Sequence, residues 1–105
     1  MKAELVFRQK KTLPLKFGGS ITVYADCYKI ADPKIGFDKA YSFSWIAFDP
    51  LNTKRRVLMD QHRGRPCHLH VEDREVEIEL PGSLEEAEEL FQGEVTKYFG
   101  EAEES

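Results

Sequence analysis

Apolar residues alternate with polar ones along most of the first 80 residues, and this period of two constrains the fold more than any other feature. Side chains of a β-strand point to opposite faces in turn, so such alternation is typical of strands with one buried face. In the first segment, Ala3, Leu5 and Phe7 are expected to share a face. Tyr41, Phe43 and Trp45 are expected to be core residues rather than an exposed stacking surface. The pattern recurs in segments 3–8, 20–30, 40–49, 54–60, 67–72 and 75–80.

A different spacing begins after residue 81 and predicts a helix over PGSLEEAEELFQGEVTKYFG, residues 81–100. Ser83 with Glu86 three positions later forms a capping box, and Gly100 is a suitable C-terminal cap. Apolar residues follow helical spacing at positions 84, 87, 91, 95 and 98. The sequence therefore predicts an α+β fold, a mostly antiparallel sheet of five to six strands with one C-terminal helix on one face. Residues 1–100 are expected to form one domain and residues 101–105 an acidic tail.

The segments CHLHVE and EVEIEL predict a hairpin with a short turn around Asp73–Arg74. Pairing residue 72 with residue 75 places Val71 beside Val76 and Leu69 beside Ile78, apolar with apolar. The same register places His70 opposite Glu77 and His68 opposite Glu79. The two histidines then lie on the face opposite to the apolar residues.

Composition excludes several classes of protein. Hydrophobic residues make up 41% of the chain and charged residues 32%, which is typical of a soluble globular domain and not of a disordered chain. No apolar run approaches the ~18 residues of a membrane span, and the N-terminus lacks the apolar stretch of a signal peptide. We therefore expect a cytoplasmic protein without a membrane partner. Cys27 and Cys67 are too few for a disulfide framework and are expected to be reduced, buried residues.

The net charge of −4 conceals two parts of opposite sign. Residues 1–74 carry 14 basic and 8 acidic side chains, whereas residues 75–105 carry one basic and 11 acidic side chains. The basic part contains the histidines and could face a polyanion such as RNA. The acidic part could be a solvated helix face with its tail, or it could repel a polyanion or fold over the basic part as a competitor.

All three histidines lie within DQHRGRPCHLHVE, residues 60–72. His68 and His70 are two residues apart on a predicted strand, which places them on one face roughly 6.5–7 Å apart. Three interpretations fit this spacing. The pair could transfer protons at a phosphodiester, it could bind a metal ion with Asp60 or Glu77, or it could stabilise the sheet through cross-strand carboxylates.

Of these, proton transfer without a metal or other cofactor is the preferred hypothesis. His68 and His70 are the predicted catalytic pair, and Asp60 is expected to hold the loop. Guanidinium groups neutralise phosphate charge, so the neighbouring basic residues are predicted to bind the substrate. The predicted substrate-binding residues are Lys54, Arg55, Arg56, His62, Arg63, Arg65 and Arg74.

At this stretch the chain resembles the TumE family of small bacterial toxins from toxin–antitoxin modules. That family has an opening strand similar to MKAEL, a tyrosine-rich strand, an Asp-Asn-x-x-Gly-Lys-Gly-Asp-His-x-His stretch and a short C-terminal helix. In DQHRGRPCHLH, Asp60, Gly64, His68 and His70 match this motif, and Arg65 stands for the lysine. The chain departs from the motif at three positions, with Gln61 for asparagine, Pro66 for glycine and Cys67 for aspartate.

The resemblance covers nearly the whole chain and implies a toxin that acts on RNA. It also implies a cognate antitoxin as partner, of the helix-turn-helix class. The expected function is thus a toxin, acting as a metal-independent ribonuclease. Two alternatives stay open: a non-enzymatic module that binds nucleic acid or protein, and a small metal-binding protein with a His-x-His site.

Overall fold

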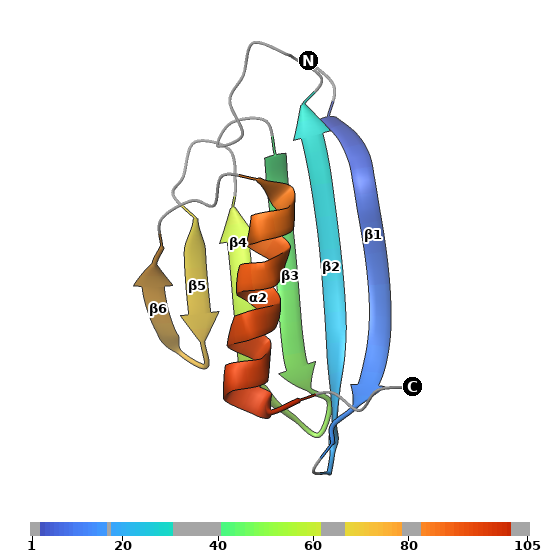
Figure 1. The fold of residues 1–105 in the computed structure, drawn as a ribbon, viewed down its shortest axis with the longest axis vertical. Coiled ribbons are helices and arrows are strands. Elements are labelled where there is room, and N and C mark those ends of the chain that lie inside the picture. Colours follow the sequence, from blue (N-terminus) through green and yellow to red (C-terminus); the bar gives the residue numbers. More distant parts are fainter. Residues whose placement is uncertain (1–2, 17, 31–40, 62–66, 79–82, 102–105) are drawn as a thin grey trace.

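Over the residues that it describes, the computed structural model of the chain is a single antiparallel sheet with one helix on one face, which confirms the predicted α+β class (Figure 1). The structure describes residues 3–16, 18–30, 41–61, 67–78 and 83–101. No helix in these ranges is long and apolar enough to cross a membrane. The elements are β1 (Ala3–Pro14), β2 (Ser20–Ile30), β3 (Tyr41–Asp49), β4 (Asn52–Gln61), β5 (His68–Val71), β6 (Arg74–Glu77) and α2 (Leu84–Phe99).

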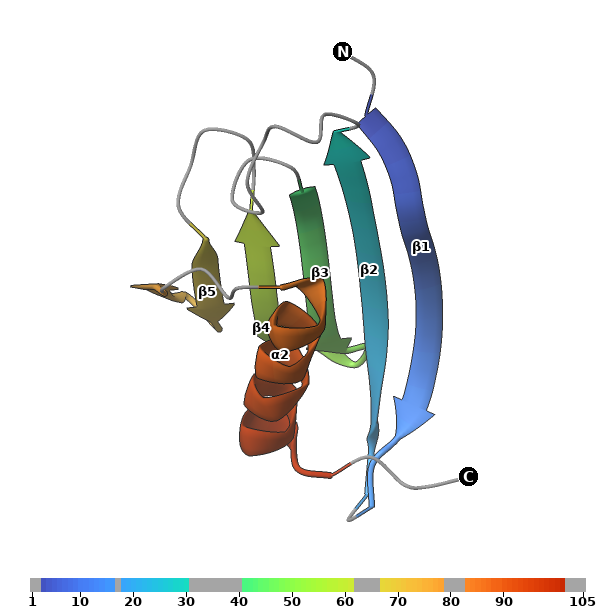
Figure 2. The ribbon, with the colours of Figure 1, turned by 45° about the horizontal axis from the view of Figure 1, so that its top comes forward.

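Each strand pairs with its neighbour in the sequence, so the sheet order is β1-β2-β3-β4-β5-β6. Antiparallel neighbours need only short connections, and the strands therefore follow one another across the sheet without a crossover. The helix α2 returns from the β6 end and lies over the middle of the sheet (Figures 1 and 2). The sheet consequently has two different faces, which we call the helix face and the open face.

The helix face holds the core. Trp45 is 2% exposed, and its ring stacks on Phe43 with ring centres 4.2 Å apart and meets the edge of Phe91 from α2 at 5.8 Å. The prediction that Tyr41, Phe43 and Trp45 are core residues is confirmed for Phe43 and Trp45, while Tyr41 is half-buried and packs against the core. Other buried members come from four strands and the helix: Ile21, Ala25, Cys27, Ala47, Val57, Met59, Leu69, Ala87 and Val95.

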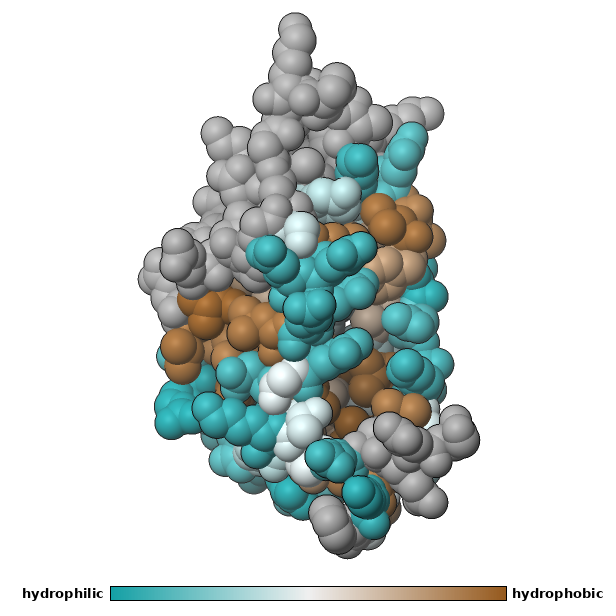
Figure 3. Space-filling view, in the orientation of Figure 1, coloured by the Kyte–Doolittle hydropathy of each residue, from teal (hydrophilic) through white to brown (hydrophobic). Residues whose placement is uncertain are grey.

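The helix does not cover the whole of this face. In Figure 3 polar residues run down its middle, and apolar residues lie on both sides of them. On the β1–β2 side a pocket of about 310 Å³ is lined by apolar residues that include Phe7 and Val95 and by polar ones that include Lys11 and Glu88.

The predicted ends of α2 are confirmed. Ser83 is the N-cap, and its side-chain oxygen accepts a hydrogen bond of 3.2 Å from the backbone N–H of Glu86. At the other end, the backbone N–H of Gly100 donates to the Thr96 carbonyl over 2.8 Å. Glu101, the first residue of the predicted tail, accepts a backbone hydrogen bond of 2.9 Å from Lys16. This residue is thus held against the end of β1, while the rest of the tail lies outside the described residues.

The strict alternation predicted for residues 3–8 is wrong. A β-bulge lies between Leu5 and Phe7: Leu5 pairs with Tyr28, whereas Phe7 pairs with Cys27. Because residues 27 and 28 belong to opposite faces, Leu5 and Phe7 do not share a face. Leu5 is 52% exposed, and Phe7 packs against the core.

The register predicted for the β5–β6 hairpin is also wrong, by two residues. Val71 pairs with Arg74 and Leu69 pairs with Val76, because the turn consists of Glu72 and Asp73 only. Glu72 has a φ of 57°, as the tightest hairpin turns require. A shift of two residues keeps every side chain on its face, so the predicted separation of histidines from apolar residues is correct. Glu79, the predicted partner of His68, lies outside the described residues.

Candidate functional site

The strand pairing gathers the predicted catalytic residues on the open face. Asp60 of β4 pairs directly with His68 of β5, and the next residue of β4 on this face, Leu58, pairs with His70. Directly paired and diagonal residues on one face of a sheet are within side-chain reach of each other. Asp60 therefore lies opposite one histidine and diagonal to the other.

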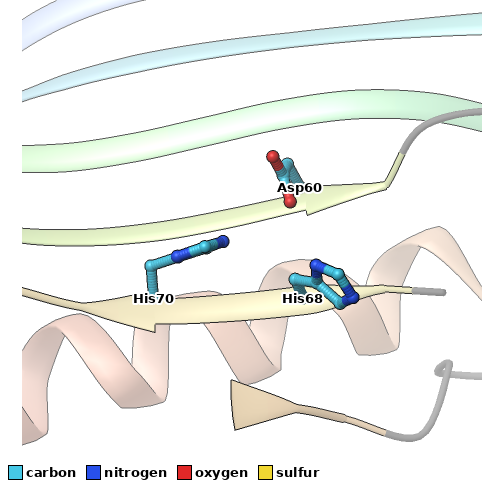
Figure 4. Close-up of side chains that lie close together, drawn as sticks. All are labelled: Asp60, His68 and His70. Carbon is cyan, nitrogen blue, oxygen red and sulfur yellow. The ribbon is translucent and has the colours of Figure 1, made fainter. Parts of the chain in front are cut away.

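The side chains of Asp60, His68 and His70 converge (Figure 4). One carboxylate oxygen and one ring nitrogen from each histidine all lie within 4.8 Å of one another, and all three residues are half-buried. The two rings have their centres 6.1 Å apart with planes at 65°. Among the described residues, this is the group of three histidine and carboxylate side chains whose polar atoms lie this close to one another.

A second carboxylate holds His68. Its Nδ1 atom lies 2.6 Å from Oε1 of Glu75 on β6, with the His68 side chain 29% exposed. Such a contact fixes the orientation of the ring and the tautomer that it adopts. The sequence pattern placed Glu77 opposite His70 and Glu79 opposite His68, whereas the structure pairs Glu75 with His70 and Glu77 with His68. Glu75 therefore reaches His68 diagonally across the two strands, a contact that the pairing register alone does not specify.

The predicted substrate-binding residues divide into those outside the described residues, one on the open face, and those that do not join the histidines. His62, Arg63 and Arg65 lie outside the described residues. Arg56 belongs to the open face, since it pairs with Phe48, and its guanidinium lies 3.7 Å from Asp73.

The remaining basic residues do not join the histidines. Arg55 turns to the helix face, where its guanidinium lies 5.7 Å from the ring centre of Phe99 and 3.5 Å from Asp49. Arg74 pairs with Val71, which places it on the face opposite to His68. Lys54 is exposed, and its backbone N–H donates to the side chain of Asn52 over 3.3 Å.

The open face also carries an aromatic and basic group that the sequence alone did not reveal. Tyr24 of β2 and Phe48 of β3 stack with ring centres 5.9 Å apart and planes at 5°. Lys10 of β1 lies over the Tyr24 ring, with Nζ 5.1 Å from its centre. Arg8 lies over Tyr28 at 5.9 Å and donates a hydrogen bond to its hydroxyl. Tyr24 and Tyr28 alternate along β2 with the buried residues Ala25 and Cys27, but only the pairing of three strands places them beside Phe48 and the basic side chains.

The two thiols take no part in this site. Cys67 is buried on the helix face, and burial together with the charge of Asp60 raises the pKa of its thiol from 9.0 to about 11. Burial, followed by the charges of Asp26 and Glu88, raises the pKa of Cys27 to about 11 as well. A thiol with such a pKa is protonated near neutral pH, which makes it a poor nucleophile.

The site offers two kinds of chemistry. Two imidazoles and a carboxylate can exchange protons with a substrate, or they can supply nitrogen and oxygen ligands to a metal ion. Comparison with family models, with curated proteins and with solved structures gives no match. The resemblance to TumE toxins therefore rests on the motif residues and stays a prediction.

Proposed function

We propose that this protein is the toxin of a cytoplasmic toxin–antitoxin module and that it cleaves RNA on the open face of its sheet. The observation that supports this proposal most is the convergence of Asp60, His68 and His70, whose polar atoms lie within 4.8 Å of one another. The sequence motif that resembles the TumE family contains the same three residues. The partner implied by that resemblance is an antitoxin of the helix-turn-helix class.

In the proposed reaction the two histidines act as base and acid. One imidazole takes the proton from a ribose 2′-hydroxyl, and the 2′-oxygen forms a bond to phosphorus. The bond from phosphorus to the 5′-oxygen breaks, and the other imidazole gives this leaving oxygen a proton. Glu75 orients His68 for its part in the transfer. A substrate without the 2′-hydroxyl has no internal nucleophile, so DNA is not cleaved.

The rest of the open face is suited to a single strand of RNA. Tyr24 and Phe48 provide aromatic surface for bases, while Arg8, Lys10 and Arg56 provide positive charge for phosphates. Single strands bind to such combinations because bases stack on aromatic rings without regard to sequence. The aromatic group lies on β2 and β3, and the histidines lie on β5 of the same face.

The proposal is tested by RNA cleavage in the presence of a chelator. We expect the wild-type protein to cleave single-stranded RNA, and His68→Ala and His70→Ala each to reduce the rate by ~10²–10⁴-fold. Both variants should keep the wild-type midpoint of thermal unfolding to within a few degrees, because neither ring belongs to the core. Glu85→Ala in the first turn of α2 is the matched control, and it should cleave at the wild-type rate. Folded histidine variants that cleave at the wild-type rate would disprove the assignment.

A non-enzymatic RNA-binding module is the second candidate, and the stacked pair Tyr24–Phe48 is the observation that favours it. In that case RNA binds and is not cleaved. Tyr24→Ala would then weaken binding, whereas His70→Ala would not. If the protein binds RNA and does not cleave it, with or without added divalent metal, the protein is a binding module and not a ribonuclease.

A further inference from the structure

We infer that Asp60, His68 and His70 form a binding site for a divalent transition-metal ion, and that the ion inhibits the proton transfer proposed above. The first part stands on the geometry of the three side chains alone. The second part rests on the proposed function, since a nitrogen that binds a metal cannot accept a proton.

The donor set defines the class of ion. Two imidazole nitrogens and one carboxylate oxygen suit Zn²⁺, Ni²⁺ or Cu²⁺, whereas Mg²⁺ and Ca²⁺ prefer oxygen ligands only. Metal–nitrogen bonds to zinc are about 2.0–2.1 Å long, so two ligands of one ion lie at most about 4.2 Å apart. The donor atoms of the three residues already lie within 4.8 Å of one another. Small rotations of the side chains are therefore enough to bring them onto one ion.

The backbone under the site is regular. Asp60 and His68 are direct partners in an antiparallel ladder, and His70 follows on the same strand. A site on paired strands holds its ligands closely, because the backbone positions cannot move independently. The three residues are half-buried, which removes part of their hydration.

Glu75 adds the support that metal-binding histidines usually have. Its carboxylate lies 2.6 Å from Nδ1 of His68. Carboxylates in this position orient a ligand histidine, and their removal typically costs 10–100-fold in metal affinity. Cys67 does not belong to the ligand set, since its thiol is buried on the opposite face of the sheet.

Titration of the metal-free protein with ZnCl₂, followed by calorimetry, tests the site without RNA. We expect one ion per chain, and a loss of affinity of at least about tenfold in Asp60→Asn, His68→Ala and His70→Ala. Glu75→Gln should weaken binding by about 10–100-fold. Cys67→Ala and Glu85→Gln are the controls, and both should bind zinc as the wild type does.

Nuclear magnetic resonance of the wild-type protein provides a measurement that does not depend on any variant. Zinc should shift the ring resonances of His68 and His70 together, with the same midpoint. Zinc that binds with equal affinity to Asp60→Asn and His70→Ala, or that leaves both rings unshifted, would overturn the inference.

A separate assay addresses inhibition. With RNA present, zinc should reduce cleavage by at least about tenfold, and a chelator should restore the rate. Zinc that binds at the three residues but accelerates cleavage would overturn the inhibitory role. If the protein cleaves no RNA under any condition, the proposed function fails, while the calorimetric result for the metal site stands by itself.

Discussion

Gly93 lies inside α2, and a Cβ atom added there would meet no atom within 4 Å. Alanine has a higher helix propensity than glycine and a less flexible unfolded state. Gly93→Ala should therefore raise the free energy of unfolding by about 0.5–1 kcal/mol, as measured by urea denaturation. Gly100→Ala is the contrasting variant, since Gly100 has a φ of 91°, which other residues rarely adopt. It should lower the free energy of unfolding by about 1 kcal/mol or more. Equal effects of the two substitutions would contradict this account.

The two buried thiols make the stability of the protein fall at high pH. Their pKa values are raised from 9.0 to about 11, so the unfolded chain loses these protons before the folded one does. The resulting stability is fully present below pH 9 and is lost as the pH rises through 11. We expect a loss on the order of 2 kcal/mol for each thiol over this range. Urea denaturation at several pH values measures how steeply the free energy of unfolding falls with pH. This fall should be clearly less steep in the double variant Cys27→Ala, Cys67→Ala. An unchanged fall would assign the loss of stability to other groups.

At the level of elements, the turn between β5 and β6 combines backbone strain with a side-chain contact. Glu72 has a φ of 57°, and its carboxylate accepts a hydrogen bond from the Tyr98 hydroxyl on α2. Asparagine adopts this backbone conformation more readily than glutamate does. In a Tyr98→Phe background, which removes the hydrogen bond, Glu72→Asn should raise the free energy of unfolding by about 0.5–1 kcal/mol. In the wild-type background the gain should be smaller, because the substitution also loses the contact. A double-mutant cycle of the four proteins measures both quantities.

The same turn explains why the elements could be predicted while their pairing could not. Alternation identified six strands, and capping residues identified both ends of α2. Two registers of the β5–β6 hairpin, however, pair apolar with apolar residues, and the sequence pattern favoured the one with more such pairs. The structure adopts the other, because a two-residue turn closes at Glu72–Asp73. The bulge at Val6 was missed for a related reason, since an extra residue in one strand appears only against its partner.

For the whole molecule, the face of the sheet on which a basic side chain lies should determine whether that side chain contributes to RNA binding. Lys10 and Arg56 lie on the open face, whereas Arg55 turns to the helix face. Each phosphate contact of a single strand contributes ~0.7 to the slope of log affinity against log salt. Lys10→Gln and Arg56→Gln should each flatten this slope by about that amount, and Arg55→Gln should not change it. Fluorescence anisotropy with a labelled single-stranded RNA measures all three. Equal slopes in the three variants would show that RNA does not lie on the open face.

The sequence predicted those residues of the candidate site that lie on one strand, but not those that other strands bring to it. His68 and His70 share a face by their spacing in one strand, which needs no knowledge of the sheet. Asp60 was included as a neighbour in sequence, and its role beside the rings follows only from the pairing of β4 with β5. Glu75 and the Tyr24–Phe48 pair belong to other strands. Residues of this kind are brought together by topology, and no motif in the sequence connects them.

The order of strands in the sheet also governs how the chain acquires its structure during synthesis. Every strand pairs with the one made just before it, so the hairpins have low contact order and can form one after another as the chain emerges. The helix α2 is made after all six strands, yet it is the element that covers Trp45. Until residues 84–99 have been translated and have docked, the apolar side of the growing sheet faces water. The nascent chain is therefore most prone to aggregation between the synthesis of β6 and the docking of the helix, which ends that exposure.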